Sequence, residues 1–291
     1  MIWSQYKTLY NNALRTYSPK FKQELQNQVN TFCRTQDLNE ISDKALKQTI
    51  QKLHIAMGNR MALIASKDVK KGSKSHFTTY EKKSEQTDLF SYVILQYLNT
   101  KGLSQLASDI TDTTKEQIRR FLIKGQEDGL TTYETIQLLK TAGITDYRAE
   151  LIARTETARA ANVGSMVGAI STGLVTVKEW IATKDNRTRR IPRDNADHLD
   201  MDGVIAPIDA KFEVRGKGFV DFMLHPGDST ARASNVCNCR CTLGYEAVRD
   251  SNGQLKKYAD NPPMGDAGLI WNLLNNVIGM EIGNLIAEAL A

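Results

Sequence analysis

Proline placement is the feature that most constrains this chain, because only one of its six prolines, Pro19, precedes residue 192. Proline removes a backbone donor and breaks helix interiors, and glycine weakens them. Most of the 19 glycines also lie in the second half. We therefore expect a helical N-terminal half and a turn-rich C-terminal half. The overall prediction is an α+β fold in which a small, mainly antiparallel sheet packs on a long helix.

We expect three parts in the domain organisation, and the motifs described below, not the composition, set the limits of the middle part. Residues 1–109 form a helical N-terminal region, and residues 110–260 form an α+β module. Residues 261–291 form a linker and a C-terminal amphipathic helix.

Composition narrows the class of protein. Hydrophobic residues make up 41% of the 291 residues and charged residues 24%, as in ordinary soluble proteins. This excludes a wholly disordered, collagen-like or disulfide-dense chain. The N-terminal stretch holds no continuous apolar segment, so we expect no secretory signal. Cys237, Cys239 and Cys241 alternate too closely to form disulfides with one another, which favours a reducing compartment. On a strand, this alternation would place all three side chains on one face.

Helix signals are clear in the first half. Ser18-Pro19 has the form of an N-cap followed by proline at the first helical position, so a helix is expected to begin there. Residues 67–85 are polar and rich in lysine, and predict a solvated loop, with helix resuming at Asp88. A patch for DNA or another acidic surface is the alternative for this segment.

Capping-box patterns locate the next helices. The patterns and the helices they predict are Thr113-x-x-Glu116 for 114–128 and Thr131-x-x-Glu134 for 132–141. A longer helix follows from 144 to about 171. Its many alanines and glycines favour close packing against a sheet.

The pattern changes to strands after Gly173. The segment 174–182 is rich in β-branched residues and contains Trp180, so it reads as a strand. Further strands are expected near 203–206, 211–214, 219–224 and 239–245.

The C-terminal segment 266–291 predicts an amphipathic helix. Its asparagines and glutamates interrupt an apolar stretch that has the length of a membrane span. We favour a helix that binds a partner or lies at a membrane interface, with a docked terminal helix as the alternative.

The most specific feature is an ordered set of residues between 180 and 241. The stretch Arg154-Thr155-Glu156-Thr157 precedes this set. The set itself is Trp180, Asp185, Arg187, Arg189, His198, Asp202, Gly203, Pro226, Gly227, Asp228, Asn238, Cys239, Arg240 and Cys241.

This set resembles the phage head-morphogenesis family, the minor head proteins similar to Mu protein F and to the minor capsid protein of phage SPP1. The resemblance covers about 110 to 245, and the closing Asn-Cys-Arg-Cys is its most specific part. It departs from the family in the segment 190–197, which separates Arg189 from His198. Contact between these two residues would need a local loop.

The resemblance implies a role and partners. It implies a minor head protein bound to the phage portal protein and other head proteins, inside the capsid near the portal, and in the host cytoplasm during assembly. It would act by binding, in head assembly and in DNA packaging or ejection. Contact with packaged DNA is a further expectation, and membrane contact by the C-terminal helix is left open.

Two chemical alternatives remain for the same residues. Zinc is a possible cofactor, with His198, His225, Cys239 and Cys241 as candidate ligands. A core role for the cysteines is the competing interpretation. The alternative function is a metal-dependent enzyme acting on nucleic acid, with Cys239 and His198 as a conceivable nucleophile and base. We do not expect enzymatic activity. For Asp185, Arg187 and Arg189 we expect an ion-pair network that orders loops.

A positive run is the candidate for DNA contact, because arginine-rich loops hold phosphates well. Its members are Lys184, Arg187, Arg189, Arg190 and Arg193.

Overall fold

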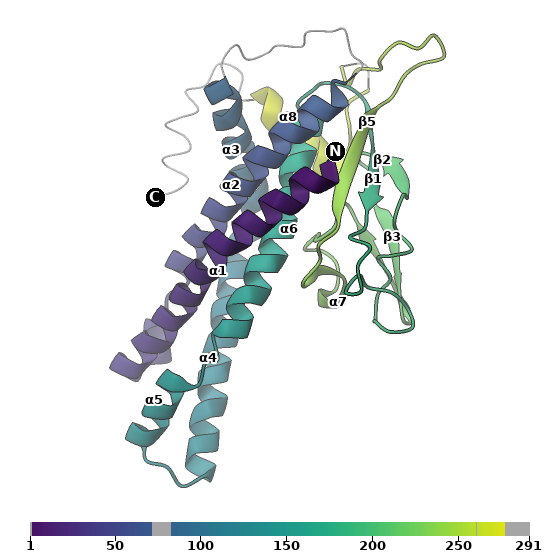
Figure 1. Cartoon of the computed structure of the whole chain (residues 1–291). Helices are drawn as coiled ribbons and strands as arrows, with labels where there is room; N and C mark the ends of the chain where they lie inside the picture. The colour runs from purple at the N-terminus through teal and green to yellow at the C-terminus, as the bar shows by residue number, and fades with distance from the viewer. Residues whose placement is uncertain (1, 72–82, 260, 277–291) are drawn as a thin grey trace.

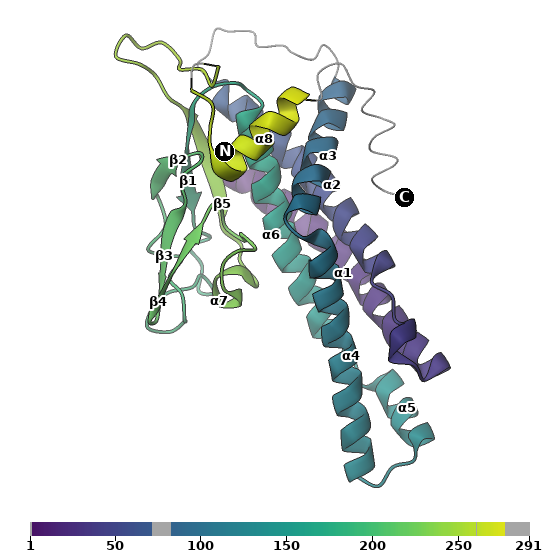
Figure 2. The same ribbon diagram turned by 180° about the vertical axis from the view of Figure 1, so that it is seen from behind.

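The structure, a computed structural model, describes residues 2–71, 83–259 and 261–276 (Figures 1 and 2). A bundle of long helices lies beside a small β layer. The helices are α1 (Ile2–Thr35), the 3-10 helix η1 (Leu38–Glu40), α2 (Lys44–Val69), α3 (Lys83–Thr100), α4 (Leu103–Glu127), α5 (Thr132–Thr141), α6 (Asp146–Ile170), α7 (Ala233–Val236) and α8 (Gly265–Asn276). The strands are β1 (Thr176–Ile181), β2 (Ile205–Pro207), β3 (Phe212–Gly216), β4 (Phe219–Met223) and β5 (Thr242–Ala247).

Helix α6 is the centre of the molecule. Every residue from 155 to 170 is buried, the pattern of a helix that is covered on all sides. It packs mainly against α2 and α1, and β5 contacts α1, α2 and α6. The α+β prediction is therefore confirmed, with the sheet packed on the long helix.

Two of the small residues of α6, Gly164 and Gly168, face helix α2. A Cβ added at Gly164 would lie 2.3 Å from the Gly58 Cα, and one at Gly168 would lie 2.0 Å from the Ala62 carbonyl oxygen. For these two glycines the expected contact with the sheet is replaced by α2, because α2 carries matching small residues at Gly58 and Ala62 and its backbone lies in that position.

The β layer has the predicted antiparallel pairing. One sheet has the order β2-β1-β5, and β3 and β4 form a separate hairpin. Four of the five expected strands lie within about two residues of their predicted positions, while β5 begins three residues later, after Cys241.

Two helix starts differ from the predictions. Helix α1 begins at Ile2, and Pro19 lies inside it, because buried aromatic side chains at Tyr6, Tyr10 and Tyr17 continue the apolar face upstream. Thr113 is not an N-cap either. It lies inside α4, where its Oγ1 donates to the Asp109 carbonyl at 2.8 Å.

The second capping box is confirmed. Thr131 Oγ1 accepts from the Glu134 backbone N–H, and the Glu134 side chain accepts from the Thr131 N–H at 2.8 Å. Helix α2 includes the start of the polar segment 67–85, and α3 begins at Lys83, earlier than the expected Asp88. Residues 72–82 of this segment lie outside the described part.

Two predicted boundaries, at residue 110 and at residue 261, lie within the described part of the chain. Residue 110 lies inside α4, and one hydrophobic core includes residues from both sides of it. In α8, Ile270 and Leu274 are buried, so this described portion is a docked helix in contact with α3 and α6. Residues 277–291 lie outside the described part. Among the described helices, none combines the length and apolar character of a membrane span.

Candidate functional site

A buried cluster of one histidine and two cysteines lies beside the sheet. The His198 Nδ1 is 3.6 Å from the Cys239 Sγ and 3.7 Å from the Cys241 Sγ. All three ligand atoms lie within 4.8 Å of one another, and each residue is at most 2% exposed. Three of the four predicted zinc ligands therefore come together.

The turn that precedes β5 points both cysteines inward. Asn238 follows α7 with φ 57°, a left-handed conformation that asparagine tolerates better than most residues. Its backbone N–H donates to Thr155 Oγ1 of α6 at 3.1 Å. Cys237 remains half-buried outside the cluster, so only two of the three cysteines share a face.

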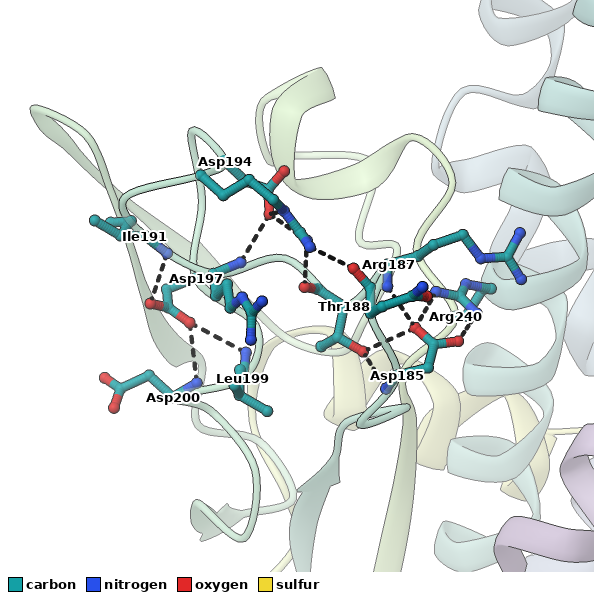
Figure 3. A network of polar contacts seen from close by, with 12 residues as sticks. Asp185, Arg187, Thr188, Ile191, Asp194, Asp197, Leu199, Asp200 and Arg240 are labelled. Carbon is teal, nitrogen blue, oxygen red and sulfur yellow. Dashed lines mark hydrogen bonds and ion pairs between the residues drawn. The ribbon is translucent and has the colours of Figure 1, made fainter.

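A loop brings His198 to the cysteines despite the segment 190–197. The backbone N–H groups of His198 and Leu199 both donate to the Arg189 carbonyl at 3.0 Å. Within the loop, Asp194 accepts from the Arg190 N–H and Asp197 accepts from the Ile191 N–H (Figure 3). The extra residues thus form a closed loop, and Arg189 and His198 are adjacent.

Side chains behind His198 fix its orientation. Asn235 Nδ2 donates to the Asp221 carboxylate at 2.7 Å, and Arg232 donates to the same carboxylate. A carboxylate only accepts hydrogen bonds, so the Asn235 Oδ1 must be the atom facing His198 Nε2, at 3.1 Å. His198 therefore carries its proton on Nε2, and in its neutral form its Nδ1 lone pair points to the thiols.

The two thiols have opposite tendencies to ionise. The contact with the neighbouring Cys241 thiol, together with the contact with His198 and the positive charge of Arg189, holds the pKa of Cys239 well below its usual value in spite of burial. The contact with Cys239 and burial raise the pKa of Cys241. Of the two thiols, Cys239 therefore loses its proton more readily.

Two polar groups near the thiols lack ordinary partners. The Trp180 ring meets His198 edge-on at 5.4 Å. Its N–H makes no conventional hydrogen bond but lies close enough to Cys241 to oppose the rise of that thiol's pKa. The Tyr6 hydroxyl is buried without a partner, and burial, then the charges of Tyr10 and both cysteines, raises its pKa.

His225 does not join the cluster, which corrects the prediction for the fourth ligand. Its Nδ1 lies 3.0 Å from the carbonyl of Pro226. Burial lowers its pKa, although the nearby Asp228 opposes this. The turn that begins at His225 faces α6 instead, where Arg159 donates to the Gly227 carbonyl and Asn162 donates to that of Pro226.

The rest of that turn is also structural. Gly227 has φ 82° and lies close to Arg159, so a side chain there would be strained. Asp228 accepts from the backbone N–H groups of Leu224 and Thr230 at 2.8 and 2.9 Å.

A buried ionic group joins α2 to α6. Glu156 accepts from Arg159 at 2.9 Å, and its other oxygen lies 3.1 Å from the His54 Nε2. Glu156 is therefore an internal ion-pair residue, whereas Arg154 pairs with Glu150 along the more exposed side of α6.

Asp185 has a different partner from the predicted one. Its carboxylate makes a bidentate ion pair with Arg240 (Figure 3). Arg240, then the Arg187 backbone N–H, hold the pKa of Asp185 far below its usual value. Arg187 is exposed. It donates its backbone N–H to Asp185 and its charge also lowers the pKa of that carboxyl group, but no side-chain hydrogen bond or ion pair joins Asp185, Arg187 and Arg189 as predicted.

The remaining motif residues close the loop after β1. Asp202 accepts from the Ala182 backbone N–H at 3.0 Å. Gly203 has φ 81°, and its N–H donates to the Trp180 carbonyl at 2.8 Å.

The positive run is partly committed to internal contacts. Lys184 pairs with Asp202 at 2.6 Å. Arg189 donates to the carbonyls of Asn235 and Cys237, and Arg193 pairs with Asp194. Within the described residues, the exposed side chains of Arg187 and Arg190 make no hydrogen bond or ion pair.

Sequence reasoning missed several residues that support the cluster. Asn235 and Asp221 set the His198 orientation, and Asn162 fixes the turn at Pro226. Lys178 is completely buried in β1, where its Nζ donates to the carbonyls of Ile208 and Leu224. In the sequence, the only sign of these residues is that they are polar residues within apolar segments.

Comparison with known proteins supports the motif assignment. Residues 116–244 match the family model described as phage Mu protein F like protein. No curated protein and no solved structure matches the chain. The matched segment runs from α4 into β5 and contains the complete motif set from Trp180 to Cys241. Over this segment, which is less than half of the chain, the sequence is therefore similar to the phage Mu protein F-like family, a similarity consistent with a phage head-morphogenesis protein.

Proposed function

We propose that this protein is a minor head protein that is attached to the portal inside the capsid. The family match over residues 116–244 carries the proposal. The protein acts in head assembly and in DNA packaging or ejection. It works by binding its partners and not by turning over a substrate. It is in the host cytoplasm during assembly and in the virion afterwards.

The placement of the motif residues supports binding over catalysis. A catalytic group must touch its substrate, but Trp180, His198, Cys239 and Cys241 are at most 2% exposed. Their neighbours hold loops to α6 and to the sheet. The motif set thus behaves as the framework of a folded module.

The end of the molecule formed by α4 and α5 offers a docking surface. This end projects beyond the β layer (Figure 1). Exposed large apolar side chains of this kind mark interaction sites when they gather on one surface. Ile123 of α4, Tyr133 and Leu138 of α5, and Tyr147 at the start of the adjoining α6 are 56%, 72%, 47% and 69% exposed. A groove of about 660 Å³ lies there too, lined in part by Phe32, Leu122 and Ile136.

DNA contact is a second part of the proposal. Arg187 and Arg190 have exposed side chains in the loop after β1, and a free guanidinium suits a phosphate. Binding of a DNA duplex should weaken steeply as salt rises. It should also weaken when both arginines become alanine, relative to the ion-paired control Lys184→Ala. Retention that does not depend on salt would contradict this contact.

The proposed function is tested by measuring whether the protein is incorporated into phage heads. The chain is produced together with the portal and capsid proteins of its phage, and purified heads are analysed by quantitative mass spectrometry. We expect a few copies per head. Complete absence from portal-containing heads would contradict the proposal. A metal-dependent nuclease activity that His198→Ala abolishes would instead support the enzyme alternative.

A further inference from the structure

We propose that His198, Cys239 and Cys241 bind a zinc ion that ties the start of β5 to the loop between β1 and β2. This inference does not depend on the proposed function, because it concerns the folding of the module. A structural zinc ion is compatible with a head protein and with an enzyme.

The ligand geometry is the first observation. Zinc bonds of about 2.3 Å to sulfur and about 2.0 Å to nitrogen, at tetrahedral angles, separate those two ligand atoms by about 3.6 Å. The His198 Nδ1 lies 3.6 Å from one sulfur and 3.7 Å from the other. One nitrogen lone pair accepts one S–H well, but here two sulfurs approach it at nearly equal distances. Both nitrogen–sulfur distances thus match the spacing of ligand atoms in a zinc tetrahedron, and the two sulfurs lie within 4.8 Å of each other.

The surroundings of His198 are the second observation. A histidine that ligates zinc commonly donates its other ring N–H to an oxygen that holds the ring in place. The Asn235 Oδ1 has that position at 3.1 Å, and Asp221 fixes Asn235 in turn. The nitrogen that faces the sulfurs is therefore the one without a proton, as metal binding requires.

Unpartnered polar groups are the third observation. Buried polar atoms without partners are uncommon in folded proteins and call for an explanation. The Trp180 N–H and the Tyr6 hydroxyl are both buried without a conventional hydrogen bond, and the Trp180 ring packs edge-on against His198 at 5.4 Å. A buried N–H donor beside the cluster suits sulfur ligands that carry the negative charge of metal-bound thiolates.

Three protein ligands leave one coordination position for a water molecule or other oxygen. Zinc prefers nitrogen and sulfur ligands in such sites, and thiolates favour it over magnesium or calcium. Because the cluster is buried, the ion serves as a cross-link between two chain segments that are about 40 residues apart, 198 and 239.

The test measures the zinc content of the full chain, purified without a metal-binding tag. We expect about one zinc ion per chain in the unmodified protein. Cys239→Ser and Cys241→Ser should each remove most of it. Cys237→Ser is the matched control, since this half-buried cysteine lies outside the cluster, and it should retain the full content.

A spectroscopic measurement covers the case in which the serine variants do not fold. Cobalt(II) added to the folded, metal-free protein should give thiolate-to-cobalt charge-transfer bands and tetrahedral d–d bands. X-ray absorption at the zinc edge should find two sulfur ligands, with nitrogen or oxygen completing the site. Less than about a tenth of an equivalent of zinc after incubation with excess metal, in folded protein with free thiols, would overturn the proposal.

Discussion

The Asn235 Oδ1 accepts a hydrogen bond from the His198 Nε2 at 3.1 Å, and this contact decides which nitrogen of the histidine faces the two cysteines. Asn235 is thus a positioning residue for the cluster. Its own orientation comes from Asp221, which lies in β4. The cluster therefore depends on contacts that reach from the β1–β2 loop through α7 to the hairpin.

Asn235→Ala should weaken zinc binding about 10- to 100-fold, the usual effect of removing such a supporting contact. The measurement is competition with a chelator of known affinity. Asn252→Ala, an exposed asparagine in a turn beyond β5, is the control and should bind zinc as the unmodified protein does. Unchanged affinity in the Asn235 variant would show that this contact does not position a ligand.

Glu156→Gln should lower the free energy of unfolding by about 3–5 kcal/mol, because it leaves the Arg159 charge buried without its partner. Burial opposes ionisation of Glu156, but Arg159 and His54 hold its pKa below the usual value. Glu150→Gln breaks the more exposed pair with Arg154 on the same helix. This control should cost less than about 1 kcal/mol. Urea denaturation measures both, and equal losses would contradict the prediction.

Gly164→Ala should destabilise the fold by about 1–3 kcal/mol, although alanine favours helices more than glycine does. The added Cβ would meet the backbone of Gly58, which cannot rotate away. Gly125→Ala is the comparison, since the three atoms nearest to its added Cβ all belong to the side chain of Thr135 and not to a backbone. We expect a smaller loss there. Thermal unfolding measures the stability of both variants. A Gly164→Ala variant that is as stable as the unmodified protein, or more stable, would contradict the prediction.

Lys178 should make stability depend on pH. Burial lowers its pKa from 10.5 to about 7, against the attraction of Asp209 and Asp228. The unfolded chain therefore binds more protons than the folded chain between about pH 7 and 10. The contribution of Lys178 to the free energy of unfolding is therefore lowest below pH 7, and it rises with pH above 7 by up to about 1.4 kcal/mol per pH unit.

The comparison with Lys178→Met isolates that contribution. The variant loses two hydrogen bonds to carbonyl groups at every pH, so it can be less stable throughout. The difference between unmodified protein and variant should nevertheless grow in favour of lysine from pH 7 to 9. A difference that stays constant over this range in urea denaturation would mean that Lys178 keeps its charge when folded.

The sequence predicted those elements whose determinants are local. The Thr131 capping box needs only Thr131 and Glu134, and the strand around Trp180 needs only its own residues. The Ser18-Pro19 start failed because buried tyrosines upstream extend α1, which is a tertiary effect. Thr113 failed because its pattern is equally compatible with the inside of a long helix.

The candidate site was predictable in part for a similar reason. The motif named His198, Cys239 and Cys241, but spacing alone could not separate His225 from them. That separation depends on how the turn at His225 docks on α6 through Arg159 and Asn162. Asn235 and Asp221 were missed because their roles arise only when α7 and β4 meet beside the His198 loop.

The central claim, that the protein works by binding the portal, is tested most directly with the two purified proteins. Folded full-length chain is mixed with assembled portal oligomers and examined by analytical ultracentrifugation. We predict co-sedimentation of the two proteins, and weaker co-sedimentation for the double variant Tyr133→Ser/Leu138→Ser at the α5 end than for Phe222→Ser on β4. Independent sedimentation of folded chain and intact portal would contradict the account.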